Sequence, residues 1–230
     1  MLFVCGDIHG ERMRLGEMIL RMGNYPGPHT LLVCGDFGFT FTEEELTSLR
    51  GDMFALEGEV EILFVDGNHE NFDCLNGLPV EEYRGALTQV LAPNVRRLMR
   101  GEVVELEGKT FLALGGARST DRDWREELRV TTGQRFWWPE ELPGPEAVEN
   151  ARANLRARGW KVDYILSHAA PAGVLKEMNL PAPHPAEREF LSGLELIRRG
   201  TEFRNWFFGH YHVDETFENC RCLYRDLVIL

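Results

Sequence analysis

The sequence predicts an α/β fold whose strands are covered by helices on both faces. Within the first seventy residues, a short apolar run followed by a Gly-Asp or Gly-Asn pair occurs three times. These pairs recur at intervals close to the length of a βαβ unit, which is about 30 residues. The apolar runs are continuous rather than alternating, which is typical of strands buried on both faces.

The remaining elements follow from local pattern along the chain. Pro145 stands where a helix is expected to begin, a position that proline favours, and Glu107-Gly108 is the expected turn between two strands. We expect strands at residues 2–5, 31–34, 62–65, 95–99, 103–106, 110–114, 164–167 and 203–208, and two or three short strands within 213–230. We expect helices at residues 11–22, 42–56, 145–158 and 186–199, a loop-rich stretch with one short helix at 71–92, and loops at 115–144 and 173–185.

Composition limits the classes of function. The chain of 230 residues is 43% hydrophobic, enough for one sizeable core, and we expect one domain over residues 1–230. The net charge is −12, from 37 acidic and 25 basic residues. A protein that neutralises phosphates along a duplex is usually basic, so nucleic acid is expected only as a substrate.

Membrane insertion and secretion are not expected. The apolar runs are of strand length, far short of the roughly 18 residues that a membrane span needs. The N-terminus, MLFVCGDIHG, has no basic region before its first motif, so we expect no signal peptide and a cytoplasmic location. The five cysteines are expected to be reduced, because Cys220 and Cys222 have no second pair with which to complete a zinc site.

Five short blocks stand at the carboxyl ends of expected strands, where ligands bind in open α/β sheets. A lone Gly-Asp is usually a turn and a lone His usually a satisfied side chain, but five such blocks in order favour a metal site. Their oxygen and imidazole donors suit Mn²⁺, Fe, Zn²⁺ or Ni²⁺, and the lack of thiolates argues against structural zinc. The blocks are GDIHG at 6–10, GDFG at 35–38, GNHE at 67–70, SHAAP at 167–171 and GHYH at 209–212.

This ordered set resembles the signature of the calcineurin-like metallophosphoesterases, which reads GD-x-HG, GD, GNH[ED], a lone His and GH-x-H. The resemblance spans residues 6–212, and residues 115–141 also resemble a block found in a bacterial and phage subgroup of the family. It implies a four-layer α/β/β/α sandwich, in which two mixed β-sheets are flanked by helices. It also implies a dinuclear metal site at one edge of that sandwich.

The resemblance assigns a role to each motif residue. It implies that one divalent ion is bound by Asp7, His9 and His212, the second by Asn68, His168 and His210, and that Asp36 bridges both. Mn²⁺ is the first choice, with Fe, Zn²⁺ and Ni²⁺ as alternatives. A hydroxide held between the two ions would attack phosphorus in line. His69 would protonate the leaving alcohol or stabilise the phosphoryl charge, unless it only orients a neighbouring ligand.

The chain departs from the protein Ser/Thr phosphatases of this superfamily, which carry GD-x-VDRG. Here the second block continues as Phe37-Gly38, so the second acid and the arginine are missing, which weakens any case for phosphoprotein substrates. Residues 115–141 combine arginines with tryptophans, and we expect this insertion to recognise substrate. Arg118 and Arg125 would form a phosphate clamp. If Trp137 and Trp138 lie on a strand, one of them would face the cleft. The alternative is a surface loop with Arg–acid pairs and core tryptophans.

The sequence therefore predicts a hydrolase of small phosphomonoesters or phosphodiesters. A nuclease that stacks single strands on the Arg/Trp block is a second hypothesis, which the acidic charge disfavours. A metal-free scaffold that binds partner proteins is a third, which the complete set of seven ligand positions disfavours. The preference between monoesters and diesters, the natural substrate, the native metals and the oligomeric state stay open.

Overall fold

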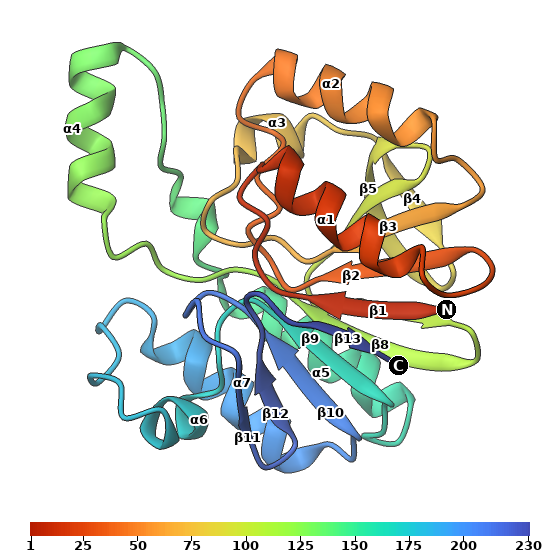
Figure 1. Cartoon of the computed structure of the whole chain (residues 1–230). Coiled ribbons are helices and arrows are strands. Elements are labelled where there is room, and N and C mark those ends of the chain that lie inside the picture. Colours follow the sequence, from red (N-terminus) through yellow and green to blue (C-terminus); the bar gives the residue numbers. More distant parts are fainter.

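The computed structural model describes residues 1–230 as two β-sheets packed face to face, with helices on both outer surfaces (Figure 1). One sheet has seven strands in the order β13-β1-β2-β3-β6-β5-β4, and the other has six in the order β11-β12-β10-β9-β8-β7. Both sheets contain parallel and antiparallel pairs. The expected four-layer sandwich of two mixed sheets is therefore confirmed.

The seven-stranded sheet is built around a parallel centre. There β1, β2, β3 and β6 run in the same direction, and β13 pairs antiparallel with β1 at one edge. Helix α2 begins with a capping box in which Thr42 and Glu45 exchange side-chain and backbone hydrogen bonds. The strands are β1 (Leu2–Cys5), β2 (His29–Val33), β3 (Val60–Phe64), β4 (Val80–Tyr83), β5 (Ala86–Ala92), β6 (Val95–Leu98) and β13 (Leu227–Ile229), and the helices are α1 (Arg12–Met22), α2 (Glu43–Phe54) and α3 (Phe72–Asn76).

The six-stranded sheet repeats this plan with helices on its own outer face. Strands β8, β9, β10 and β12 are parallel, while β7 and β11 pair antiparallel at the two edges. The strands are β7 (Val103–Leu106), β8 (Lys109–Leu114), β9 (Tyr164–Ser167), β10 (Asn205–Phe208), β11 (Glu215–Phe217) and β12 (Cys220–Cys222), and the helices are α5 (Pro145–Ala157), α6 (Ala172–Glu177) and α7 (Arg188–Gly200).

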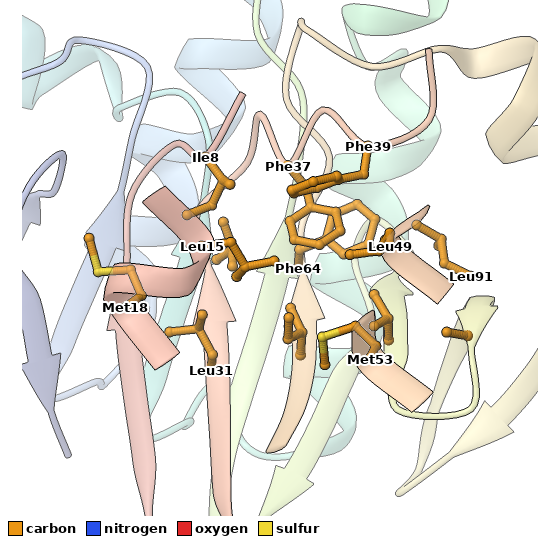
Figure 2. Close-up of a cluster of buried hydrophobic side chains, with 14 of the residues drawn as sticks. Ile8, Leu15, Met18, Leu31, Phe37, Phe39, Leu49, Met53, Phe64 and Leu91 are labelled. Carbon is orange, nitrogen blue, oxygen red and sulfur yellow. The ribbon is translucent and has the colours of Figure 1, made fainter. Parts of the chain in front are cut away.

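Three apolar layers hold these elements together. Helices α1 and α2 cover one face of the first sheet. Met18 of α1, Leu49 of α2 and Phe64 of β3 belong to the same buried apolar cluster (Figure 2). A middle layer between the sheets includes Leu63 and Phe111, and a third layer lies under α5 and α7. The central strands are thus buried on both faces, which explains why their apolar runs are continuous in the sequence.

Three parts of the chain hold elements that the sequence pattern does not reveal. Residues 71–92 contain the hairpin β4–β5, and the expected loop at 173–185 begins within α6. The insertion contains α4 (Arg122–Thr132), which stands away from the body in Figure 1. Its only buried side chain is Arg125, whereas Trp124 and Val130 are exposed, so α4 lacks the apolar stripe by which helices are recognised. No helix is long and apolar enough to cross a membrane.

A buried ion cluster fixes the end of β3 just before the third motif. The carboxylate of Asp66 is fully buried and lies 2.8 Å from Arg97 Nη2 and 2.9 Å from Arg100 Nε. Burial alone would raise the pKa of Asp66, but Arg100 and Arg97 outweigh that effect and lower it. The Arg100 guanidinium also donates to the carbonyl of Glu140, so the cluster ties the insertion to the first sheet.

We expect Asp66→Ala to destabilise the protein by about 3–5 kcal/mol, because it leaves buried guanidinium groups without their counter-charge. Urea unfolding followed by circular dichroism would measure this loss. Asp52→Ala is the matched control, since Asp52 pairs with Arg12 on the surface, where such pairs contribute about 1 kcal/mol or less. Equal losses for the two variants would contradict a structural role for the Asp66 cluster.

Candidate metal centre

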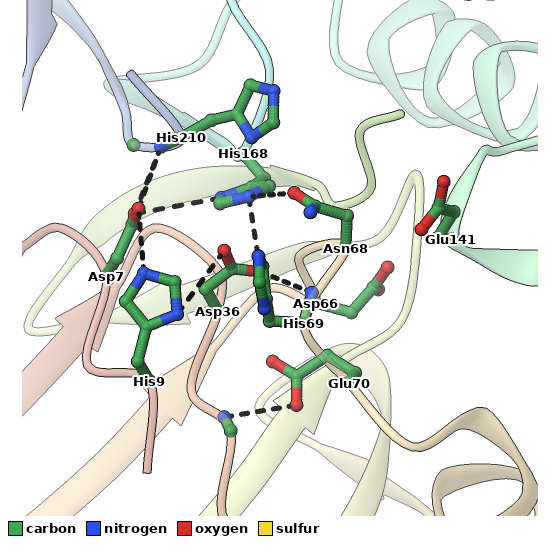
Figure 3. A network of polar contacts seen from close by, with 12 residues as sticks. Asp7, His9, Asp36, Asp66, Asn68, His69, Glu70, Glu141, His168 and His210 are labelled. Atoms are coloured by element: carbon green, nitrogen blue, oxygen red, sulfur yellow. Dashed lines mark hydrogen bonds and ion pairs between the residues drawn. The ribbon is translucent and has the colours of Figure 1, made fainter. Parts of the chain in front are cut away.

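All eight motif residues lie together where strands of both sheets end, and all but His212 are labelled in Figure 3. Three strands of the first sheet and two of the second lead into the site, because the carboxyl ends of parallel strands meet at one edge. Strand β1 leads to Asp7 and His9, β2 to Asp36, β3 to Asn68 and His69, β9 to His168, and β10 to His210 and His212.

One group of side chains surrounds Asp7. Its Oδ2 lies 3.0 Å from His212 Nε2 and 3.7 Å from His9 Nε2, and the two imidazole nitrogens are 3.0 Å apart. The three residues offer one ligand atom each within 4.8 Å of one another, close enough to hold one ion. The backbone N–H of His210 donates to Asp7, which holds the carboxylate in place.

Asp36 occupies the middle of the site. Its carboxylate lies 3.3 Å from His168 Nε2 on one side and 3.8 Å from His9 Nδ1 on the other. The Oδ1 atom of Asn68 is 3.0 Å from His168 Nε2, and the rings of His168 and His210 are 4.9 Å apart. Asp36 therefore lies between the group around Asp7 and the group around His168, although Asp7 itself also comes within 3.9 Å of His168 Nδ1.

The backbone takes uncommon conformations to bring these side chains together. Residues His9, Asp36, His210 and His212 all have positive φ, between 48° and 71°, which is rare outside glycine and costs free energy. A Cβ atom on Gly67 would lie only 1.9 Å from Asp36 Oδ1. Position 67, just before Asn68, therefore requires glycine, because the backbone there passes directly against the buried carboxylate of Asp36.

The charges of the site are strongly coupled. Burial opposes charge on Asp36 and on His168, but their contact outweighs it, so the pKa of Asp36 is lowered and the pKa of His168 is raised. Burial lowers the pKa of His210 to about 3 and also lowers the pKa of His9. Both rings are therefore neutral near neutral pH, and neutral imidazole is the form that binds metals.

The donor set fits divalent cations. Asp7 and Asp36 are both almost completely buried, and buried carboxylates need a positive charge or hydrogen-bond donors beside them, which a bound cation would supply. His168 Nδ1 lies 2.8 Å from the carbonyl oxygen of Cys34, the kind of contact that fixes a metal-binding ring through its other nitrogen. The oxygen and imidazole donors suit Mn²⁺, Fe, Zn²⁺ or Ni²⁺.

His69 has surroundings that differ from those of the other histidines. It also lies within ligand distance of His9 and Asp36, so proximity alone does not separate it from the candidate ligands. However, Arg125 Nη2 lies 2.9 Å from its Nδ1 and 2.6 Å from its Nε2. A guanidinium in contact with both ring nitrogens disfavours a second cation there. Burial lowers the pKa of His69 to about 4.

The two arginines of the expected clamp lie on different flanks of the site. Arg125 is almost fully buried, donates to the carbonyl of Asn68 and pairs with Asp121 at 2.9 Å, so α4 delivers it to the flank of His69. Arg118 instead lines a cavity that reaches His210. The two arginines thus lie beside different motif histidines, Arg125 at His69 and Arg118 near His210, and their role in binding substrate stays a prediction.

The tryptophans of the insertion are not on a strand, so the premise that neighbours face opposite sides does not apply. Trp138 is buried in the first core layer, with its ring 6.0 Å from that of Phe41. Trp137 is half-buried under the guanidinium of Arg122, 4.2 Å away. Core packing, the alternative reading, is correct for Trp138.

Sequence reasoning missed three residues that support the motif loops. Asn68 Nδ2 donates to Ser119 Oγ, which donates in turn to Glu141 Oε2 at 2.5 Å, so the amide oxygen of Asn68 faces His168. Glu70 accepts hydrogen bonds from the backbone of Phe37 and Gly38, directly after Asp36. The position of Glu70 at the end of the GNHE motif could have indicated that it supports the site. Nothing in the sequence pattern links Ser119 and Glu141 to the site.

Comparisons with known proteins give one family match and two distant structural likenesses. The model of the family described as calcineurin-like phosphoesterase matches residues 2–214. A solved candidate 5′-nucleotidase from Staphylococcus aureus is 16% identical with a TM-score of 0.48, over 97% of this chain and 48% of that one. A phosphopantetheinyl hydrolase from Mycobacterium tuberculosis is 17% identical with a TM-score of 0.46, over 97% of this chain and 87% of that one.

The chain spans about half the length of the nucleotidase. No curated protein matches the sequence. The family match covers nearly the whole chain and includes every motif that converges on the site. The chain belongs to the calcineurin-like phosphoesterases, a family of metal-dependent hydrolases of phosphoester bonds.

Proposed function

We propose that the protein hydrolyses a small phosphomonoester or phosphodiester with the help of two divalent metal ions. The observation that carries this proposal is the position of Asp36 between two sets of donors. In the proposal Asp36 bridges both ions, of which Mn²⁺ is the first choice. Asp7, His9 and His212 hold one ion, and Asn68, His168 and His210 hold the other.

The residues of the chain would hold the metal-binding side chains, and through them the phosphate, in a fixed arrangement. When bound, the ions supply an activated water and neutralise charge on the phosphoryl oxygens. The Cys34 carbonyl orients His168, Ser119 orients Asn68, and the backbone of His210 orients Asp7. Such preorganised groups stabilise developing charge without having to rearrange during the reaction.

His69 and Arg125 form the flank where the leaving oxygen would gain negative charge. Arg125 is the only arginine in contact with a motif histidine, and it arrives from α4 in a chain that lacks the GD-x-VDRG arginine. Its Nε pairs with Asp121, its Nη1 donates to the carbonyls of Asn68 and Phe136, and its Nη2 contacts His69, so every nitrogen of the guanidinium has a partner in the chain. We therefore assign His69 to the leaving group, and Arg125 to the positioning of His69.

The two other hypotheses have weaker support. A nuclease would have to bind a polyanion with a chain of net charge −12. Of the tryptophans expected to stack on bases, Trp138 is buried and Trp137 is covered by Arg122, which leaves only Trp124 exposed. A metal-free scaffold gives no reason for two buried carboxylates among five imidazoles. The cytoplasmic location stays a prediction from the N-terminal sequence.

Metal analysis of the purified protein, together with assays on p-nitrophenyl phosphate and bis-p-nitrophenyl phosphate, tests this function. We expect two ions per chain, hydrolysis of at least one of the two compounds, and loss of activity on chelation that Mn²⁺ restores. Activity that survives complete removal of metal would contradict the proposal. Protein that neither binds metal nor hydrolyses either compound would favour the scaffold.

We expect Asp36→Asn to lose bound metal and nearly all turnover, because an amide has no charge with which to bridge two cations. Elemental analysis and p-nitrophenyl phosphate hydrolysis would measure both effects. Asp52→Asn, on the surface, is the control and should behave as the unmodified protein. Two retained ions and normal turnover in Asp36→Asn would refute the bridging assignment.

We expect His69→Ala to keep both ions but to lose about 10²–10⁴-fold in rate, the usual contribution of a general acid. The loss should be small for p-nitrophenyl phosphate and large for an alkyl phosphate if His69 donates a proton, since p-nitrophenolate needs none. An equal loss for both substrates would identify electrostatic stabilisation instead. Loss of metal in this variant would show that His69 is a ligand.

We expect Arg125→Ala to lower kcat for p-nitrophenyl phosphate by about tenfold or more, because His69 loses the guanidinium that positions it, with metal content unchanged. Arg125→Lys should recover only part of the loss, because lysine lacks the planar pair of donors. Arg129→Ala, on the exposed face of α4, is the matched control. If Arg125→Ala unfolds the protein, or alters no kinetic constant, its role is structural.

A further inference from the structure

A second feature of the site is a cavity of about 590 Å³ that opens beside His210. Its walls come from the start of the insertion, from the connection between α6 and α7, and from the GHYH motif. Arg118 and Thr120 line it on one side, and His184 and Arg188 on another. It therefore adjoins the metal centre on the flank where neither His69 nor Arg125 lies.

Arg118 is the most informative residue of this cavity. Its side chain is half-buried, and its guanidinium makes no hydrogen bond or ion pair with any other residue. A guanidinium has five N–H donors, and the nitrogens of Arg118 are open to solvent rather than buried without a partner. An unpaired guanidinium that lines a cavity next to a phosphoesterase centre is free to bind an anion from outside the chain.

The α6–α7 connection adds further donors. Arg188 is exposed; its Nε donates to the carbonyl of Pro183, and its two terminal nitrogens, which have no partner in the chain, are open to solvent or to a ligand. His184 Nδ1 accepts the N–H of Ala186, so its Nε2 carries the proton and is a donor. Glu187 is the only acidic residue of the lining, and its carboxylate accepts the backbone N–H of His184. Basic side chains thus outnumber acidic ones around the cavity.

The rest of the lining is apolar and stiff. Leu175, Leu180 and Leu191 contribute aliphatic surface, and residues 181–185 contribute three prolines. Proline fixes its own φ and has no N–H, so this wall offers hydrophobic contact with little flexibility. A binding partner for such a cavity has an apolar body, such as a ring, and an anionic group.

We propose that this cavity binds the organic part of the substrate and that Arg118 and Arg188 bind a second anionic group on it. The substrate is then a nucleotide-sized phosphoester that carries two anionic groups. This rests on the proposed function, since the phosphate to be hydrolysed must lie at the metal centre beside His210. The volume is within the range of about 300–1,000 Å³ that small-molecule sites occupy.

The test compares p-nitrophenyl phosphate, adenosine 5′-monophosphate and adenosine 3′,5′-bisphosphate as substrates and as competitive inhibitors of one another. For the unmodified protein we expect the bisphosphate to have a KM or inhibition constant about tenfold or more below that of the monophosphate, the effect of one charge-assisted contact. Arg118→Ala and Arg188→Ala should each remove most of this preference, and the double variant all of it. Hydrolysis of p-nitrophenyl phosphate, which fills little of the cavity, should be affected less.

Arg118→Lys should restore part of the preference, and Arg158→Ala, an exposed arginine at the end of α5, should change nothing. If the protein hydrolyses p-nitrophenyl phosphate but binds both nucleotides equally, with or without Arg118, this inference is wrong and the proposed function stands. Failure to bind metal or to hydrolyse any of the three compounds would instead refute the proposed function. Circular dichroism of each variant excludes unfolding as the cause of a lost preference.

Discussion

The buried Asp36 is the residue on which the architecture of the site depends. Its carbonyl oxygen accepts the backbone N–H groups of Ile8 and His9, at 3.0 and 2.7 Å, so it fixes the loop after β1. Its carboxylate accepts the N–H of His69 at 2.7 Å and contacts His168 from the second sheet. One residue in a left-handed conformation thus joins the motif loops of both sheets.

The intrinsic conformational preference of aspartate does not favour this arrangement of Asp36, because a positive φ and a buried charge both cost free energy. The surrounding structure supplies the compensation. Glu70 holds the two residues after Asp36, and the missing Cβ of Gly67 leaves room for the carboxylate. The middle apolar layer keeps the two sheets, and therefore the two halves of the site, at a fixed distance.

The sequence predicted the parts of the structure that depend on short-range patterns. Strands β1, β2, β3 and β9 lie within two residues of their expected bounds, because strands buried on both faces have continuous apolar runs. The convergence of the motif residues was also predictable, because parallel strand ends meet at one edge. Their assignment as ligands stays a prediction.

The remaining features depend on contacts between distant residues, which no local pattern encodes. Helix α4 is attached to the body through Arg125 rather than through an apolar stripe, so periodicity could not reveal it. Strand β4 is exposed along most of its length, and its pairing with β5 defines it. Arg118 and Arg125 are close in sequence, but Arg118 lines the cavity beside His210 whereas Arg125, on α4, contacts His69.

The position of the site at the boundary between the two sheets has a consequence for folding. His9 and His212 are 203 positions apart, and they approach to 3.0 Å only when both sheets have formed and packed. An ion held by this pair closes a loop of almost the whole chain, and closing a loop of that length removes much of the freedom of the unfolded state. The side chains that would bind the catalytic metal would then also hold the two sheets together. In such an arrangement the free energy of metal binding adds directly to the free energy of unfolding, so a tighter metal site makes the two sheets unfold more cooperatively.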